Sequence, residues 1–229
     1  MAEQGSTNSR TSCVIESTVG VTLDARVYQP ISDSNSTDNV VVAVLVHPYS
    51  VLGGCQALMR GIARGLSNRG VIAVTFDSRG AGKSSGRASL TGSAEINDVI
   101  SVCKWAVTNF STRKIILVGS SAGAAIAGSA VDQVEEVVAY VSLGYPFGFT
   151  ASILFGRHQK AILQSPKPKL FVMGTKDGFT SVKQLENKLK DAAGHNTTHL
   201  IEGASHFQME GPAFDADMVN LILEFITTL

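Results

Sequence analysis

The chain has 229 residues, of which 44% are hydrophobic and 17% are charged, a composition typical of one globular domain with a substantial core. Its 19 basic and 19 acidic residues cancel, which argues against a nucleic-acid-binding protein, and no apolar run is long enough to cross a bilayer. We therefore expect neither a nucleic-acid nor a membrane partner, and the composition leaves the oligomeric state open.

The cysteines and the start of the chain bear on its location. Cys13, Cys55 and Cys103 are widely spaced and form no C-x-x-C pair. The polar first residues, MAEQGSTNSR, lack the apolar segment of a signal peptide. A small, odd number of cysteines is typical of reduced thiols, so the sequence predicts a cytoplasmic protein.

The first forty residues predict a tail followed by a hairpin. Residues 1–10 are expected to be a disordered tail, and residues 11–229 a single domain. Two short strands, at residues 11–17 and 21–28, predict an antiparallel hairpin. The polar residues 32–39 are expected to form a surface loop.

From residue 40 onward, short Val- and Ile-rich runs alternate with segments of helical periodicity. Continuous apolar runs of this length are typical of strands buried on both faces of a parallel sheet. The runs occupy residues 40–46, 71–76, 114–119, 137–143, 169–174 and 198–203. The helical segments occupy residues 56–69, 94–110, 121–132, 181–192 and 213–227. This alternation predicts the α/β class, with a mostly parallel, doubly wound sheet and helices on both faces.

The segment FDSRGAGKSSG, residues 76–86, contains the GKS that ends a phosphate-binding P-loop. A P-loop needs a glycine where this chain has Asp77, whose carboxylate would face phosphate oxygens. It must also lead directly into a helix, whereas SSGRASLTGS follows Lys83 without apolar periodicity. We therefore do not expect a nucleotide site here.

The segment GSSAG, residues 119–123, follows the apolar run IILV and precedes a small-residue helical segment. G-x-S-x-G in this context is typical of a sharp strand-to-helix turn that exposes the serine Oγ. The small flanking residues Gly119 and Gly123 allow the strand and the helix to approach closely. The pattern predicts Ser121 as a nucleophile, and the alternative is a Gly- and Ser-rich turn without chemistry.

A nucleophilic serine needs a base and an acid that orients the base. Asp177 follows the run KLFVMG and His206 follows THLIEG, so both lie beyond strand ends, in the order Ser, acid, His. Ligands of such sheets bind outside the carboxyl ends of the strands. We predict Asp177 and His206 as the partners of Ser121. Taken singly, Asp177 also suits a turn or helix cap, and His206 suits an ordinary loop histidine.

An oxyanion hole needs two backbone N–H groups directed at the developing charge. One is predicted to be that of Ala122, the residue after the nucleophile. The other is expected in the loop HPYSVLGG, where Pro48 has no N–H and Tyr49 is the best candidate. His47 is expected to fix this loop rather than to act as a second base.

Together these motifs resemble the alpha/beta-hydrolase-fold serine hydrolase superfamily, and the resemblance extends from about residue 12 to the end of the chain. The chain is most similar to small members without a large cap domain, of the dienelactone-hydrolase and esterase type. The loop with Arg79, Gly80, Gly82 and Ser84 resembles the R-G-x-G-x-S loop of that superfamily, which shapes the rim of the site. Pro48 departs from the pattern, because a glycine usually follows this histidine.

The resemblance implies a carboxylic ester hydrolase that acts on a small or medium acyl substrate through an acyl-enzyme. It implies no metal and no organic cofactor. Two alternatives stay open because a fold does not fix a reaction. One is a lyase or acyltransferase that uses the same triad, and the other is a non-catalytic small-molecule-binding protein. A peptidase is also possible within the hydrolases, although no acidic specificity residue can be identified in the sequence.

Residues 144–168 have no clear place in the alternation of strands and helices. We expect a short lid-like excursion over an apolar substrate pocket with a mildly positive rim, and the alternative is a surface excursion with solvated lysines. The predicted pocket residues are Tyr145, Phe147, Phe149 and Phe155. The basic residues of the segment and its edge are Arg157, Lys160, Lys167 and Lys169.

Overall fold

The structure is a computed structural model that describes residues 8–30, 40–48, 51 and 53–229. Its strands are β1 (Asn8–Glu16), β2 (Thr22–Pro30), β3 (Val41–Val46), β4 (Ile72–Phe76), β5 (Lys114–Ser120), β6 (Val137–Leu143), β7 (Lys169–Gly174) and β8 (Asn196–Ile201). They form one eight-stranded sheet in the order β1-β2-β4-β3-β5-β6-β7-β8. Strand β2 pairs antiparallel with β1 and β4, and from β4 to β8 every neighbouring pair is parallel.

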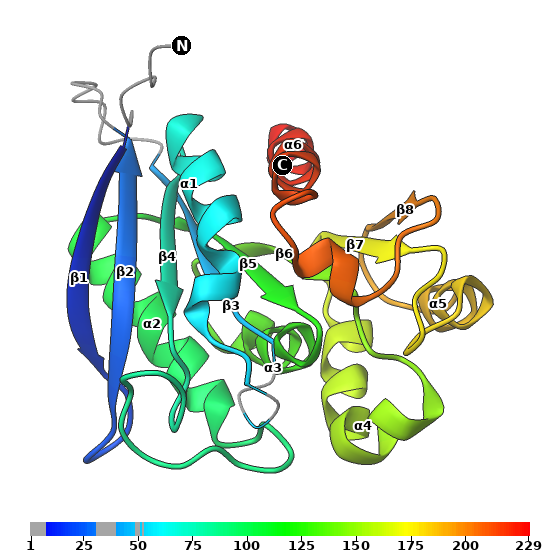
Figure 1. Ribbon diagram of the computed structural model, residues 1–229, viewed down its shortest axis with the longest axis horizontal. Coiled ribbons are helices and arrows are strands. Elements are labelled where there is room, and N and C mark those ends of the chain that lie inside the picture. The colour runs from blue at the N-terminus through cyan, green and yellow to red at the C-terminus, as the bar shows by residue number, and fades with distance from the viewer. Residues whose placement is uncertain (1–7, 31–39, 49–50, 52) are drawn as a thin grey trace.

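Helices cover both faces of this sheet (Figure 1). The α-helices are α1 (Arg60–Asn68), α2 (Glu95–Phe110), α3 (Ala122–Ala130), α4 (Phe149–Gln164), α5 (Val182–Leu189) and α6 (Asp215–Thr227). Short 3-10 helices are η3 (Gln56–Met59), η4 (Val131–Gln133) and η5 (Phe207–Glu210). No helix in the described part of the chain combines the length and the apolar character needed to cross a membrane. The predicted α/β fold, with its antiparallel N-terminal hairpin and helices on both faces, is confirmed.

The element boundaries differ from prediction at the start of the chain. Strand β1 begins at Asn8, three residues before the predicted strand at residue 11, because Asn8 pairs with Pro30 at the far end of β2. Residues 1–7 of the predicted tail and the predicted surface loop at residues 32–39 lie outside the described residues.

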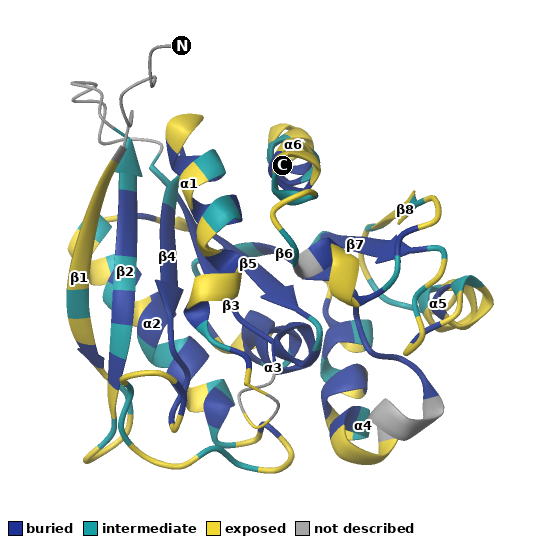
Figure 2. Cartoon of the chain, viewed as in Figure 1, coloured by how far each residue is buried: buried dark blue, intermediate teal, exposed yellow. Residues whose placement is uncertain are grey.

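The sheet separates two apolar cores. One lies between the sheet and helices α2 to α5, and the other lies between the sheet and helices α1 and α6. Figure 2 shows the central strands buried and the outer faces of the helices exposed. This two-sided burial explains why β3 to β7 are continuous apolar runs rather than alternating sequences.

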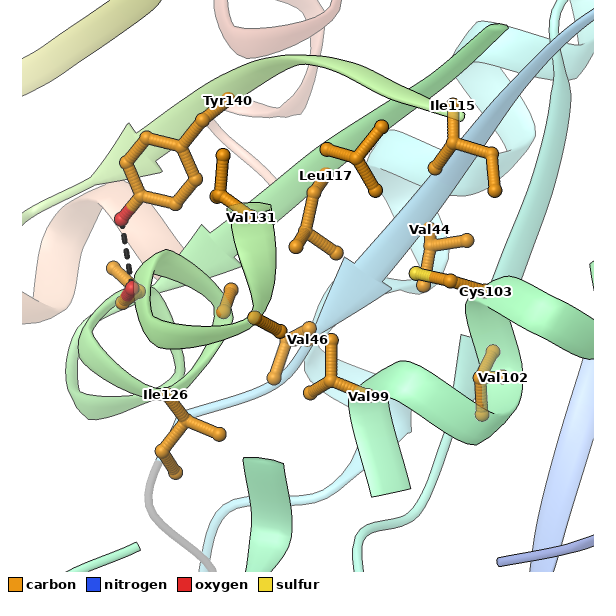
Figure 3. Close-up of a cluster of buried hydrophobic side chains, with 14 of the residues drawn as sticks. Val44, Val46, Val99, Val102, Cys103, Ile115, Leu117, Ile126, Val131 and Tyr140 are labelled. Carbon is orange, nitrogen blue, oxygen red and sulfur yellow. Dashed lines mark hydrogen bonds between the residues drawn. The ribbon is translucent and has the colours of Figure 1, made fainter. Parts of the chain in front are cut away.

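Figure 3 shows the larger core, in which valines of β3, aliphatic residues of β5 and one face of α2 meet beside α3. The Tyr140 hydroxyl of β6 donates a hydrogen bond of 2.7 Å to the Ala124 carbonyl, so this buried polar group is satisfied (Figure 3). Cys103 packs in the same core, and burial raises the pKa of its thiol to about 12. All three cysteines are free.

The segment 144–168 contains helix α4, which sequence periodicity did not reveal. The helix packs against α3, with Phe155, His158 and Ile162 buried. It therefore belongs to the helical layer on this face of the sheet, and its action as a lid stays a prediction.

The expected positive rim is wrong for two of its four basic residues. The Lys169 ammonium is buried at the start of β7 and donates to the carbonyls of Ser165, Lys167 and Ala193 at 2.6–2.9 Å. The Lys167 ammonium donates to the carbonyls of Val131 and Val134. Both lysines lie at the amino end of β7, whereas the predicted chemistry lies beyond the carboxyl ends of the strands.

His158 joins helix α4 to two other segments. Its Nε2–H donates to the Thr91 carbonyl at 2.6 Å, and the Ser129 hydroxyl of α3 donates to its Nδ1 at 2.6 Å. Because a carbonyl can only accept, Nε2 must carry the proton of the neutral ring. Burial lowers the pKa of His158, and Arg157 lowers it further, against the opposing effects of the Thr91 carbonyl and Glu95.

The lowered pKa predicts a loss of stability in acid. The pKa of His158 is lower in the folded state than its unfolded value of 6.5, so the unfolded state binds a proton first as the pH falls. The contribution of the neutral ring to stability is therefore complete above pH 6.5 and is lost as the pH falls toward the folded-state pKa. We therefore expect the free energy of unfolding to fall as the pH drops below about 7. His158→Gln should flatten part of this dependence in denaturant titrations, whereas His199→Gln, in the exposed strand β8, should preserve it. An unchanged slope in the His158 variant would contradict the prediction.

Candidate active site

Ser121 stands in a strained turn between β5 and α3. Its φ of 53° and ψ of −126° lie in a region that non-glycine residues rarely adopt. Its backbone N–H donates to the Leu143 carbonyl at 2.9 Å, and its own carbonyl accepts from Ala124 N–H, which begins the helix. The turn lifts the Ser121 side chain out of the sheet at the carboxyl end of β5, and the residue stays partly exposed.

The two glycines of GSSAG are required by the close approach of backbones. A Cβ on Gly123 would collide with the His47 carbonyl at the end of β3. A Cβ on Gly119 would collide with the backbone of Gly123 and Ala124 in the first turn of α3. The helix therefore starts against the ends of two central strands, and this contact fixes the position of Ser121.

His206 reaches Ser121 from the loop after β8. The Ser121 hydroxyl donates a hydrogen bond of 2.8 Å to His206 Nε2. His206 is 3% exposed, and beside its ring lies Gly144, whose added Cβ would come within 3.1–3.2 Å of the imidazole. Gly144 also has a φ of +71°, so both its conformation and its surroundings favour glycine.

Asp177 holds the other side of the imidazole. His206 Nδ1–H donates to Asp177 Oδ2 at 2.6 Å, and the Asp177 side chain is fully buried. Its second oxygen accepts from the backbone N–H groups of Phe179 and Thr180, at 2.7 and 2.9 Å. A carboxylate can only accept, so Nδ1 carries the proton and Nε2 is left to accept from Ser121.

The loops that carry Asp177 and His206 are packed tightly together. A Cβ on Gly174 would collide with the Ala204 carbonyl, which accepts from Lys176 N–H at 3.0 Å. Gly203 N–H donates to the Thr175 hydroxyl at 2.9 Å. These crossed contacts fix the distance between the two side chains before any substrate binds.

Two exposed aromatic residues that no sequence motif indicated lie beside His206. The ring centroid of Phe179 is 4.5 Å from that of His206, and the ring of Phe207 stands edge-on to His206 at 5.4 Å. Phe179 and Phe207 also contact each other at 5.6 Å. Their positions in the sequence, two residues after Asp177 and one after His206, were the only available signal.

The oxyanion hole is described in part. Ala122 opens α3, and the N–H groups of a first helical turn have no acceptor within the helix. Tyr49, the other predicted donor, lies outside the described residues. His47 is buried, and its Nε2 accepts from Ser78 N–H at 3.0 Å, joining the loops after β3 and β4. Burial lowers the pKa of His47, which keeps the ring in the neutral form that can accept this bond.

The predicted pocket aromatics lie mostly in the core. Tyr145, Phe147 and Phe155 are 2–5% exposed, and Tyr145 stacks on Phe147 with 4.1 Å between ring centroids. The side chain of Phe149 lies outside the described part of the structure. Contact of these four residues with a substrate stays a prediction.

The loop with the GKS sequence is fixed by a buried ion pair. The Arg79 guanidinium donates to both oxygens of Asp98 at 2.7–3.1 Å, and Asp98, in the first turn of α2, is fully buried. Asp77, which stands where a P-loop has a glycine, accepts hydrogen bonds from the backbone N–H and the side-chain amide of Gln56. A Cβ on Gly82 would collide with the Asp77 carboxylate. Asp77 and Arg79 of the loop, together with Gln56 and Asp98 outside it, therefore fix the loop in place.

Solved structures share this architecture. An alpha/beta serine hydrolase homologue from Coxiella burnetii is 26% identical, with a TM-score of 0.76 over 93% of this chain and 96% of that chain. An a/b serine hydrolase without a lid from Xanthomonas campestris is 24% identical, with a TM-score of 0.76 over 96% and 94% of the two chains. An esterase from Pyrococcus furiosus is 17% identical, with a TM-score of 0.78 over 96% and 91%. No curated protein matches the chain in sequence.

The sheet order, the strained serine turn and these similarities define a member of the alpha/beta-hydrolase-fold serine hydrolase superfamily. Within it, residues 19–155, more than half of the chain, match the X-Pro dipeptidyl-peptidase family (S15 family), and the chain belongs to that family. The matched part contains Ser121 and ends before Asp177 and His206.

The Arg79–Asp98 pair predicts a large effect on stability. Arg79→Met leaves an uncompensated carboxylate in a fully buried position, so we expect the free energy of unfolding to fall by about 3–5 kcal/mol. The matched control is Arg26→Met, because Arg26 and Asp24 form an ion pair of the same length, 2.7 Å, with side chains 21% and 15% exposed. That variant should lose at most about 1 kcal/mol. Denaturant titration measures both, and equal losses would contradict the prediction.

Proposed function

We propose that this protein is a carboxylic ester hydrolase in which Ser121, His206 and Asp177 act as a catalytic triad. The proposal is carried by the continuous hydrogen-bonded chain from Ser121 Oγ through the imidazole to the Asp177 carboxylate, at 2.8 and 2.6 Å. A structural role for these residues would not account for a strained serine presented at the carboxyl edge of the sheet.

The proposed reaction has two halves. His206 Nε2 takes the Ser121 proton while Oγ attacks the acyl carbonyl carbon, and Asp177 stabilises the imidazolium that forms. The imidazolium then gives its proton to the leaving alcohol oxygen as the C–O bond breaks, and an acyl-enzyme remains. A water molecule, deprotonated by His206, attacks the acyl-enzyme, releases the acid and restores Ser121. The steps need no metal or organic cofactor.

The Ala122 N–H is proposed to stabilise the oxyanion, with Tyr49 N–H as its partner. The Ala122 N–H belongs to the helix terminus that carries the positive end of the α3 dipole, which favours negative charge. Because Pro48 has no N–H, the second donor must come from a later residue of the loop.

A second candidate, a dipeptidyl peptidase, is favoured by the family match. Removal of a dipeptide from a free N-terminus requires a group that pairs with the substrate ammonium. The Asp177 carboxylate cannot supply it, because its side chain is fully buried and three donors already occupy its oxygens. Asp177 is therefore excluded as the partner of a substrate ammonium, and a direct comparison of ester and peptide substrates separates the two candidates.

Covalent labelling tests the triad. We expect a fluorophosphonate to add once to the wild-type protein and not to Ser121→Ala, as measured by intact mass. Asp177→Asn should slow labelling by about three to four orders of magnitude, because the amide stabilises the wrong imidazole tautomer. The control Asp191→Asn, at an exposed position, should label at the wild-type rate. A folded wild-type protein that resists labelling would exclude the triad.

The choice between ester and peptide is tested with two chromogenic substrates. We expect 4-nitrophenyl acetate to be hydrolysed with a kcat/KM at least about a hundredfold above that for Ala-Pro-4-nitroanilide. Ser121→Ala provides the background rate for the reactive ester. Faster release from the dipeptide anilide would assign the protein to the peptidases instead.

A further inference from the structure

The solvent side of His206 is lined by apolar aromatic surface. Phe179 is 39% exposed and Phe207 is 68% exposed, although each ring contacts the imidazole. Burial of a large apolar side chain normally stabilises the folded state, so such residues are usually covered. Exposed apolar surface beside a reactive group is typical of a ligand site. The pair thus presents exposed apolar surface beside the imidazole that accepts the hydrogen bond of Ser121.

The backbone that carries Phe179 is firmly fixed. Its N–H donates to Asp177, and the next residue, Thr180, donates from its hydroxyl to the Tyr145 carbonyl and accepts from Phe147 N–H, both at 2.8 Å. A Cβ on Gly148 would collide with the Phe179 carbonyl. Because these contacts fix the main chain of residues 179 and 180, the exposure of the Phe179 side chain follows from the loop conformation.

The chemistry of the triad decides which part of a substrate would meet these rings. The oxyanion lies toward the Ala122 N–H, at the start of α3, whereas the leaving oxygen must approach His206 Nε2 to receive its proton. The two phenylalanines are attached to the His206 side of the site and contact the imidazole itself. They are therefore adjacent to the leaving alcohol rather than to the oxyanion donors.

We propose that Phe179 and Phe207 form a leaving-group subsite that selects esters of aromatic or bulky apolar alcohols. The inference rests on the proposed ester hydrolase and specifies its substrate class. A purely supporting role for the rings would act on the orientation of His206 and would change the hydrolysis of all esters by the same factor. A subsite changes the ratio between substrates.

The test compares benzyl acetate with methyl acetate, which share one acyl group and have alcohols of similar basicity. In Phe179→Ala and in Phe207→Ala, the ratio of kcat/KM for benzyl to methyl acetate should fall by about tenfold. The loss should appear mainly in KM, because the contact is made in the bound substrate as well as in the transition state. Phe207 is more exposed than Phe179, so its replacement removes fewer packing contacts. The Phe207 variant therefore tests the proposal even if the Phe179 variant folds poorly.

Two controls sharpen the result. Methyl phenylacetate carries its ring on the acyl side, and its ratio to methyl acetate should stay at the wild-type value. Val14→Ala removes an exposed apolar side chain on β1, at the opposite edge of the sheet from β8, and should change neither ratio. An unchanged benzyl-to-methyl ratio in Phe207→Ala, or a loss confined to methyl phenylacetate, would overturn the leaving-group subsite.

Failure of the ester hydrolase itself would give a different result. Wild-type protein would then hydrolyse none of the three esters above the Ser121→Ala background, whether or not fluorophosphonate labels Ser121. Binding of benzyl acetate to the Ser121→Ala protein, measured by saturation-transfer NMR, still tests the subsite. Weaker binding after a further Phe207→Ala change would support it, and equal binding would overturn it.

Discussion

The hydrogen bond from His206 to the Asp177 carboxylate is the interaction on which the arrangement of the site depends. It connects the loops after β7 and β8, two neighbouring parallel strands, across the carboxyl edge of the sheet. It also selects the imidazole tautomer, and the tautomer in turn makes Nε2 an acceptor for Ser121. Because Asp177 is buried and also accepts two backbone N–H groups, the carboxylate organises the Phe179 loop and the imidazole together.

Much of this arrangement follows from local sequence. The apolar runs predicted the central strands because a strand that is buried on both faces is apolar at every position, whereas a half-exposed strand alternates. GSSAG, Asp177 and His206 could be found because each follows a strand end, where a parallel sheet gathers side chains that are distant in sequence. The structure adds the reason for the glycines, which lies in contacts with His47 and with the first turn of α3.

What the sequence left hidden depends on contacts between distant segments. Helix α4 has a weak apolar stripe, because its buried face includes His158, whose partners Thr91 and Ser129 lie far along the chain. Lys169 looked like a surface charge, since no pattern indicates that three carbonyls will surround its ammonium. The exposed phenylalanines carry no periodic signal either, because their position follows from the loops that anchor Asp177 and His206.

Positions in the site differ in how far they tolerate substitution, and Gly123 tolerates no side chain because a Cβ there would collide with the His47 carbonyl. At Gly123, even a methyl group would push the start of α3 away from the His47 carbonyl, so the position requires glycine. Phe207, in contrast, faces solvent over most of its surface and can change without disturbing the backbone. The backbone contacts thus fix the position of Ser121, whereas the aromatic surface beside His206 can be altered separately.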